Sequence, residues 1–306
     1  SNLCEASRPA SVPRVVKPLI VSQADAPPVL TSLSASWPGS GGATPSSAAR
    51  CWTPLRLARV AVRDVPASRW DCYSGVMSNR SPSTAHGGFL FHAERFDYER
   101  FNISRAEGLA TDPQHRLLLE RSYIALHCCG LSQQCLAGSA TSVTVGVCHE
   151  DFRTLTTDAE TARSPYASVG YAHSIASGRV SFNLGLHGPC VSVDTACSSA
   201  LVAIHSAKVA LQLDACPTAL AAAVNLMLTP EVTHRFANAG MLSPIGRCHT
   251  FDKRADGFVR GEACSALVLQ PAGAATIALD GSGAVVNDLQ LRGVAVRQDG
   301  KSASLT

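Results

Sequence analysis

The chain has 306 residues, of which 46% are hydrophobic and 16% are charged, so it is long and apolar enough to bury a sizeable core. This composition excludes collagen, a coiled coil and a protein dominated by an acidic or basic tail. Lysine and arginine exceed aspartate and glutamate by only 26 − 23 = +3, which argues against a dedicated nucleic-acid binder.

The beginning of the chain is rich in residues that interrupt regular structure. Residues 1–28 contain five prolines, and we interpret them as a linker or a disordered arm. Pro38–Gly42 is predicted to be a loop, because it lacks the Lys-Ser/Thr pair of a phosphate-binding loop. No segment has the pattern of a membrane span or of a secretory signal. We therefore expect a cytoplasmic, reducing environment with most thiols free.

Apolar periodicity becomes clear further along the chain. Leucines and other apolar residues at helical spacing predict a helix over Asp112–Gly130, with Asp112-Pro113 as its start and Gly130 as its stop. Ser142–Cys148 alternates valine with small or polar residues, which predicts a strand with one buried face.

A second strand and helix follow. Val191–Asp194 is predicted to be a short strand, and Ser198–Leu213 an Ala-rich helix that is apolar nearly all round, so we expect it to be buried. Two more apolar runs of strand length occur at Thr218–Met227 and Ala263–Leu269. Strands that alternate with helices indicate an α/β sheet containing parallel pairs.

The twelve cysteines are spread along the chain and include no CxxC pair, so no structural zinc site is expected. His127-Cys128-Cys129 also lacks the spacing of a ligand set, and we predict no metal site.

Cys197 is the cysteine whose position suggests chemistry. It follows a predicted strand and stands where a predicted helix begins. A helix amino terminus presents backbone N–H groups and the positive end of the dipole, which favour a thiolate nucleophile. The same N–H groups, including that of Cys197, can form an oxyanion hole, so the position fits acyl transfer through a thioester. The alternative is a structural cysteine buried in the core.

The residues around Cys197 resemble a known family. Asp194–Ser199 (DTACSS) is similar to the active-site motif of the β-ketoacyl synthases of type I polyketide and fatty acid synthases. Other segments resemble the family in the same order, across residues 29–306: Asp112–Glu120, Gly185–Pro189, Val224–Leu228, Gly240–Asp252, Asp256–Glu262 and Gln298–Gly300.

The resemblance implies an α/β, thiolase-like fold with layered α-β-α-β-α architecture. Residues 29–306 would cover the N-terminal half and the start of the C-terminal half of a β-ketoacyl synthase domain. Cys197 would accept an acyl group carried on the phosphopantetheine of an acyl carrier protein. A malonyl-type extender would then lose CO2 and condense with that thioester. No bound cofactor is implied. The implied partners are the carrier protein, other synthase domains and a second copy in a homodimer.

Two further residues are assigned by the resemblance. Phe251 and Asp252 match the loop beside the family's active site, where the phenylalanine gates the acyl pocket. We expect them to contact substrate, although an aromatic residue at this place can equally fill a core.

The chain also departs from the family pattern. The family's two catalytic histidines lie in HGTGT-like and NxGH-like segments, and neither segment occurs here, so we expect the domain to be truncated before them. His205 does not replace them, because it lies about 12 Å along the helix from Cys197 at 1.5 Å per residue. Neither His234 nor His249 is assigned a catalytic role. Alanines stand where the family has glycine, at 222, 223 and 263, which affects packing or pocket shape.

Two hypotheses follow from these observations. The first is a condensing enzyme of which this chain carries the nucleophile but not every group needed for condensation. The second is an incomplete fragment that acts as a scaffold or a docking module for the carrier protein. The intact Cys197 argues against the family's decarboxylase-only and chain-length-factor relatives, which lack the cysteine. A serine hydrolase or a nucleotide-binding protein is disfavoured, since neither a GxSxG elbow nor a phosphate loop occurs.

Overall fold

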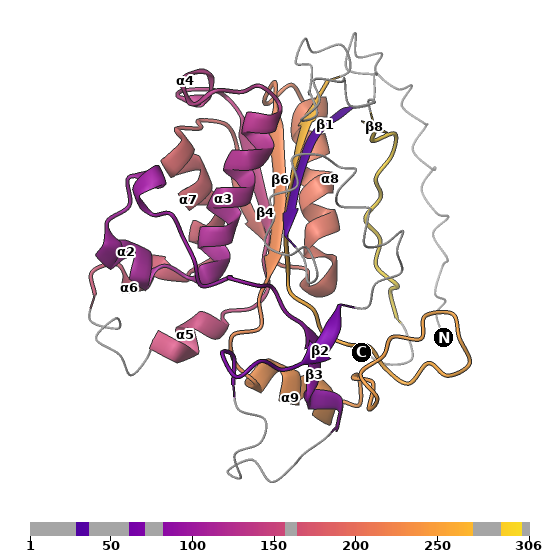
Figure 1. The fold of residues 1–306 in the computed structure, drawn as a ribbon. Helices are drawn as coiled ribbons and strands as arrows, with labels where there is room; N and C mark the ends of the chain where they lie inside the picture. Colours follow the sequence, from indigo (N-terminus) through magenta and orange to yellow (C-terminus); the bar gives the residue numbers. More distant parts are fainter. Residues whose placement is uncertain (1–28, 37–60, 71–81, 157–163, 272–288, 302–306) are drawn as a thin grey trace, which may run out of the picture.

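The computed structural model describes residues 29–36, 61–70, 82–156, 164–271 and 289–301 (Figure 1). The predicted arm at 1–28 and the predicted loop Pro38–Gly42 lie outside these residues. In the part of the chain that the structure describes, no helix has the length and apolar character needed to cross a membrane.

A mixed sheet forms the centre of the fold, with strand order β5-β4-β6-β7-β1-β8. β4 pairs in parallel with both β5 and β6, which confirms the predicted parallel pairs. The remaining pairings, β6 with β7, β7 with β1 and β1 with β8, are antiparallel. The strands are β1 Val29–Ser36, β4 Ser142–Gly146, β5 Cys190–Val193, β6 Ala219–Asn225, β7 Ala263–Gln270 and β8 Leu289–Gln290. A small antiparallel sheet pairs β2 Val62–Asp64 with β3 His86–Gly88.

Helices cover both faces of the large sheet. Helices α3 (Pro113–Cys128) and α7 (His173–Leu184) pack on one face, and α8 (Ser199–Gln212) packs on the other (Figure 1). The described residues therefore form α-β-α layers, consistent with part of the thiolase-like fold. The shorter helices are α2 Arg105–Ala110, α4 Gln133–Leu136, α5 Asp151–Thr156, α6 Ala167–Gly170 and α9 Glu231–Asn238, with 3-10 turns η1 Pro82–Thr84, η2 Glu99–Phe101 and η4 Ala196–Ser198.

Helix α3 begins and ends as its sequence predicts. The Asp112 carboxylate accepts a hydrogen bond from the backbone N–H of Gln114 at 2.7 Å, and Pro113 occupies the first turn, where no N–H is needed. Gly130, two residues past the last helical residue, has φ +77°, a conformation that glycine adopts without steric cost. Leu118 and Leu126 are fully buried on the face that packs against the sheet.

Two predictions about burial were wrong. All five residues of β4 are buried, rather than those on one face, because helices cover both sides of this strand. Helix α8 is not buried all round: Ala203 and Ala207 are buried towards the sheet, whereas Leu201 is 70% exposed. An apolar surface predicts that a helix side can be buried, but the neighbouring elements decide whether it is.

His115 in α3 makes the stability of the fold sensitive to pH. The residue is 1% exposed, and neither ring nitrogen has a hydrogen-bond partner among the described residues. Burial, together with the charges of Arg179 and His173, lowers the pKa of His115 to about 3. An unfolded chain takes up this proton near the ordinary histidine pKa, so stability is lost as pH falls from about 6.5 towards 3.

We expect His115→Gln to reduce the loss of stability between pH 7.5 and pH 5 by roughly 2 kcal/mol. Glutamine cannot be protonated in this pH range, so the substitution removes the site of proton uptake. Urea unfolding of parent and variant at the two pH values measures the difference. Burial raises the pKa of Asp112 to about 7, so the contribution of this carboxyl group to stability is lost as pH rises. The parent and the variant share this contribution, so it does not affect the difference between them. An unchanged pH dependence in the variant would exclude His115 as its source.

Candidate active site

The chain reverses sharply between β5 and α8, as the strand-turn-helix prediction requires. Ala196 has φ 53°, a left-handed conformation that an L-residue with a side chain adopts only at a cost of about 1–2 kcal/mol. Its N–H donates to the Asp194 carboxylate at 2.9 Å, which helps to hold this strained position. The turn therefore presents the next residue, Cys197, at the start of the helix.

Side-chain hydroxyls fix the rest of this turn. Ser199 Oγ accepts a hydrogen bond from the N–H of Thr195 at 2.8 Å and donates to the carbonyl of Ala196 at 2.7 Å. Ser198 Oγ donates to the carbonyl of Thr195 at 2.8 Å. The serines of the DTACSS motif thus fold back onto the residues that precede Cys197. The Cys197 thiol itself is free and exposed.

Gly146, at the end of β4, allows the sheet to approach this turn. A Cβ atom placed on Gly146 would lie 2.7 Å from the carbonyl carbon and oxygen of Ser199 and 3.0 Å from the backbone nitrogen of Ala200. Such contacts do not occur without movement of one backbone, so only glycine fits here. The position of the amino end of α8 therefore depends on the presence of a glycine, which has no side chain, at position 146 of β4.

Cys197 lines a cavity of about 670 Å³ between the ends of the central strands and α9. Most of the cavity wall is apolar, and Phe236 and Phe258 contribute to it, with their ring centroids 5.9 Å apart. Ala223 and Ala263 also line it, so two of the alanines that replace family glycines do shape this cavity. The cavity places Cys197 beside enough space for an organic ligand.

Phe251 and Asp252 are not among the residues that line this cavity. The Phe251 side chain is fully exposed, and its backbone has φ 62°. The Asp252 carboxylate receives two hydrogen bonds from the Arg254 guanidinium, at 3.0 and 2.8 Å, and these lower the pKa of Asp252. Contact between these two residues and substrate stays a prediction, as does the nucleophilic role of Cys197.

The histidines that follow Cys197 in the chain do not belong to the cavity wall. His205, His234 and His249 are partly buried, and none of them lines the cavity. No group of three or more histidine, cysteine, aspartate or glutamate residues that could hold a metal ion occurs within the described ranges.

Sequence reasoning missed three titratable residues of the cavity wall: Cys148, His149 and Arg260. The His149 ring packs edge-on to Phe236, with centroids 6.3 Å apart, and burial lowers the pKa of His149. The only available signal was their position: Cys148 is the last residue of a predicted strand, His149 directly follows it, and Arg260 lies within a family motif.

Arg260 is a buried cation in this wall. Its Nη1 donates to Thr233 Oγ1 at 2.7 Å, and its guanidinium carbon lies 5.4 Å from the centroid of the Phe236 ring. Burial lowers the pKa of Arg260, whereas the charges of Asp151, Cys148 and Glu262 oppose that shift. Its Nη2 atom has no hydrogen-bond partner among the described residues. Arg260 therefore joins α9 to the cavity wall and retains an unused donor.

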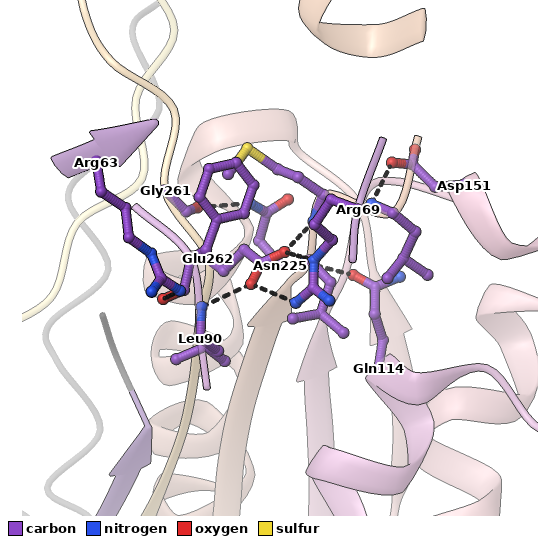
Figure 2. A network of polar contacts seen from close by, with 12 residues as sticks. Arg63, Arg69, Leu90, Gln114, Asp151, Asn225, Gly261 and Glu262 are labelled. Atoms are coloured by element: carbon purple, nitrogen blue, oxygen red, sulfur yellow. Dashed lines mark hydrogen bonds and ion pairs between the residues drawn. The ribbon is translucent and has the colours of Figure 1, made fainter. Parts of the chain in front are cut away.

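Glu262 is the centre of a buried polar network next to the cavity (Figure 2). Its carboxylate accepts hydrogen bonds from Arg69 Nε and Nη2 at 3.1 and 2.9 Å. It also accepts from the backbone N–H groups of Leu90 at 2.7 Å and Met227 at 2.9 Å. One side chain thus links segments that are far apart in the sequence.

Gln114 and Asn225 add further hydrogen bonds between segments that are distant in the sequence (Figure 2). Gln114 accepts from the N–H of Leu226 at 3.1 Å and donates to the carbonyl of His149 at 2.7 Å. Asn225 donates to the carbonyl of Gly261 at 2.8 Å. Hydrogen bonds therefore join three segments that carry the family resemblance, those containing Gln114, Asn225 and Glu262.

Comparison with known proteins agrees with this arrangement. The family described as "Beta-ketoacyl synthase, N-terminal domain" matches residues 28–275. Phthioceranic/hydroxyphthioceranic acid synthase of Mycobacterium tuberculosis is 42% identical over 260 residues, which cover 83% of this chain and 12% of the relative. A mycocerosic acid synthase-like polyketide synthase of Mycolicibacterium smegmatis is 41% identical over 266 residues, which cover 85% of this chain and 12% of the relative.

Solved ketosynthases share the fold. The ketosynthase from module 6 of the bacillaene synthase of Bacillus subtilis 168 has a TM-score of 0.68 and 35% identity, over 80% of this chain and 40% of that one. An oxazolomycin ketosynthase domain from Streptomyces albus JA3453 has a TM-score of 0.71 and 30% identity, over 81% of this chain and 44% of that one. The chain thus spans less than half of each of these solved ketosynthases and 12% of each of these two curated relatives.

Proposed function

The chain belongs to the β-ketoacyl synthase family, and we propose on this premise that Cys197 is the nucleophile of an acyl transfer. The observation that carries the proposal is the free, exposed thiol at the amino end of α8, in the wall of a largely apolar cavity. The acyl donor is the phosphopantetheine thioester of an acyl carrier protein. No cofactor needs to stay bound, because the carrier brings the reactive thioester.

In the first step the Cys197 thiolate attacks the carbonyl carbon of the incoming thioester. The tetrahedral oxyanion is stabilised by backbone N–H groups at the start of α8, including that of Cys197. Collapse of this intermediate breaks the bond to the phosphopantetheine sulfur, which leaves as a thiol after it gains a proton. The acyl group then remains on Cys197 as a thioester, with its alkyl chain in the apolar cavity.

In the second step a malonyl-type extender on its carrier loses CO2, and the resulting carbanion attacks the Cys197 thioester. The new carbon–carbon bond gives a β-ketoacyl product on the carrier and releases the Cys197 thiolate. We assign no group of this chain to the decarboxylation, because the family's two histidine segments do not occur in it. The relatives are multidomain polyketide synthases, which supports other synthase domains as partners. A second copy in a homodimer is proposed as a further partner. Phe251 and Asp252 are proposed to act at substrate entry. A thiol nucleophile also favours a reducing, cytoplasmic setting.

We expect a short-chain acyl thioester of pantetheine to transfer one acyl group to each chain, on Cys197. Intact mass spectrometry followed by peptide mapping locates the group, and Cys197→Ala should abolish the transfer. Cys135 and Cys190 serve as internal controls, because both thiols are exposed and neither lines the cavity. Equal acylation of these controls, or transfer to the alanine variant at the parent's rate, would contradict the proposal.

A further inference from the structure

A second thiol, that of Cys148, lines the same cavity as Cys197. The two cysteines follow adjacent parallel strands, because β4 pairs with β5 and Gly146 stands opposite Val193. The N–H of Val147 continues this pairing by donating to the carbonyl of Val193 at 3.2 Å. Cys148 is the next residue after that hydrogen bond, and Cys197 is presented by the turn that follows β5. The fold therefore brings two free thiols to one space.

The surroundings of Cys148 keep its thiol protonated and place a cation near it. Burial raises the pKa of the Cys148 thiol, Asp194 and Cys197 raise it further, and the nearby Arg260 guanidinium opposes the shift. Cys148 is therefore mainly a protonated thiol near neutral pH and a poor nucleophile towards an acyl thioester. Within the described residues Arg260 Nη2 has no hydrogen-bond partner, so this cation has a donor available in the wall when a thiolate forms.

We propose that Cys148 is a resolving thiol, which captures oxidised Cys197 in a reversible disulfide. The oxidant is a hydroperoxide, ROOH. The Cys197 thiolate attacks the distal oxygen, the O–O bond breaks, and the products are Cys197 sulfenic acid and the alcohol ROH after one proton is gained. The Cys148 sulfur then attacks the sulfenic sulfur, its proton leaves with the hydroxide as water, and a Cys148–Cys197 bond forms.

This disulfide would block the nucleophile without destroying it. Sulfinic and sulfonic acids on Cys197 cannot be reduced by a dithiol, whereas a disulfide can. This inference rests on the proposed function in one respect: the thiol that the disulfide protects is the proposed nucleophile, Cys197. The chemistry needs Cys197 to be reactive towards peroxide, not to carry an acyl group.

The test uses the full chain, reduced and then freed of reductant, with tert-butyl hydroperoxide as the probe. We expect intact mass spectrometry to show the loss of two hydrogen atoms, and digestion under non-reducing conditions to yield one linked pair of peptides, containing Cys148 and Cys197. Dithiothreitol should restore the original mass and the free Cys197 thiol. In Cys148→Ser the linked pair should be absent, and Cys197 should gain two or three oxygen atoms instead.

Cys190→Ser is the matched control, because Cys190 is exposed on β5 but does not line the cavity, and its linked pair should form as in the parent. Circular dichroism of both variants excludes unfolding as the cause of a lost link. A link from Cys197 to any other cysteine, or equal overoxidation of Cys197 in parent and Cys148→Ser, would overturn the inference. Acyl transfer by the reduced parent is measured separately, so a failure of the proposed function is distinguishable from a failure of this one.

Discussion

Replacing Glu262 with glutamine is expected to lower the free energy of unfolding by about 3–5 kcal/mol, the usual cost of leaving one partner of a buried ion pair unpaired. The Glu262 side chain is fully buried and that of Arg69 is 10% exposed, so water replaces little of the lost interaction. Every group around this carboxylate is a donor: the two Arg69 nitrogens and two backbone N–H groups. A glutamine amide would direct its own N–H bonds at one pair of these donors, which leaves them unsatisfied.

Urea unfolding of the parent and of Glu262→Gln measures this loss. Asp252→Asn provides a matched control, because Asp252 also receives two hydrogen bonds from one arginine, but on the surface. Solvent screens that pair, so its loss should change stability little or not at all. If the two substitutions had equally small effects, the network in Figure 2 would not be a main source of stability.

Replacing Gly146 with alanine is expected to slow acylation of Cys197 about a hundredfold, the effect of misplacing a reacting group by about 1 Å. The added Cβ would lie 2.7 Å from the Ser199 carbonyl, so the amino end of α8 must move away from β4. The same overpacking should cost about 1–3 kcal/mol of stability. The acyl-thioester assay and urea unfolding report the two effects separately.

Gly178→Ala is the control for this substitution. Gly178 lies inside helix α7, and a Cβ built on it meets nothing within 4 Å. Alanine there should leave acylation unchanged and stabilise the helix by about 0.5–1 kcal/mol. An unaltered acylation rate in Gly146→Ala would mean that the close contact between β4 and α8 does not position Cys197.

Local patterns in the sequence predicted the individual elements well. The helix at α3 and the strands at β4, β5, β6 and β7 occur where apolar periodicity and capping residues placed them. The strand-turn-helix around Cys197 was also predicted, because the break between β5 and α8 has a local cause in its turn residues. The family resemblance agreed with these elements and was confirmed by the comparisons.

Patterns of this kind could not predict what covers each element. The alternation in β4 indicated one buried face, but the whole strand is buried. The composition of α8 indicated a buried helix, but one side of it is exposed. Nor did they indicate that β7 and β1 join the sheet in antiparallel pairings. Periodicity describes the surface of one element, whereas burial also depends on the elements that pack against it.

The sequence alone thus determined the nucleophile candidate and the family, because both depend on short motifs of consecutive residues. Only the tertiary structure identified Cys148, His149 and Arg260 as parts of the Cys197 cavity. It also showed that Glu262 binds Arg69, 193 residues away in the chain. Contacts over such separations are created by strand order and helix packing, so no local spacing encodes them.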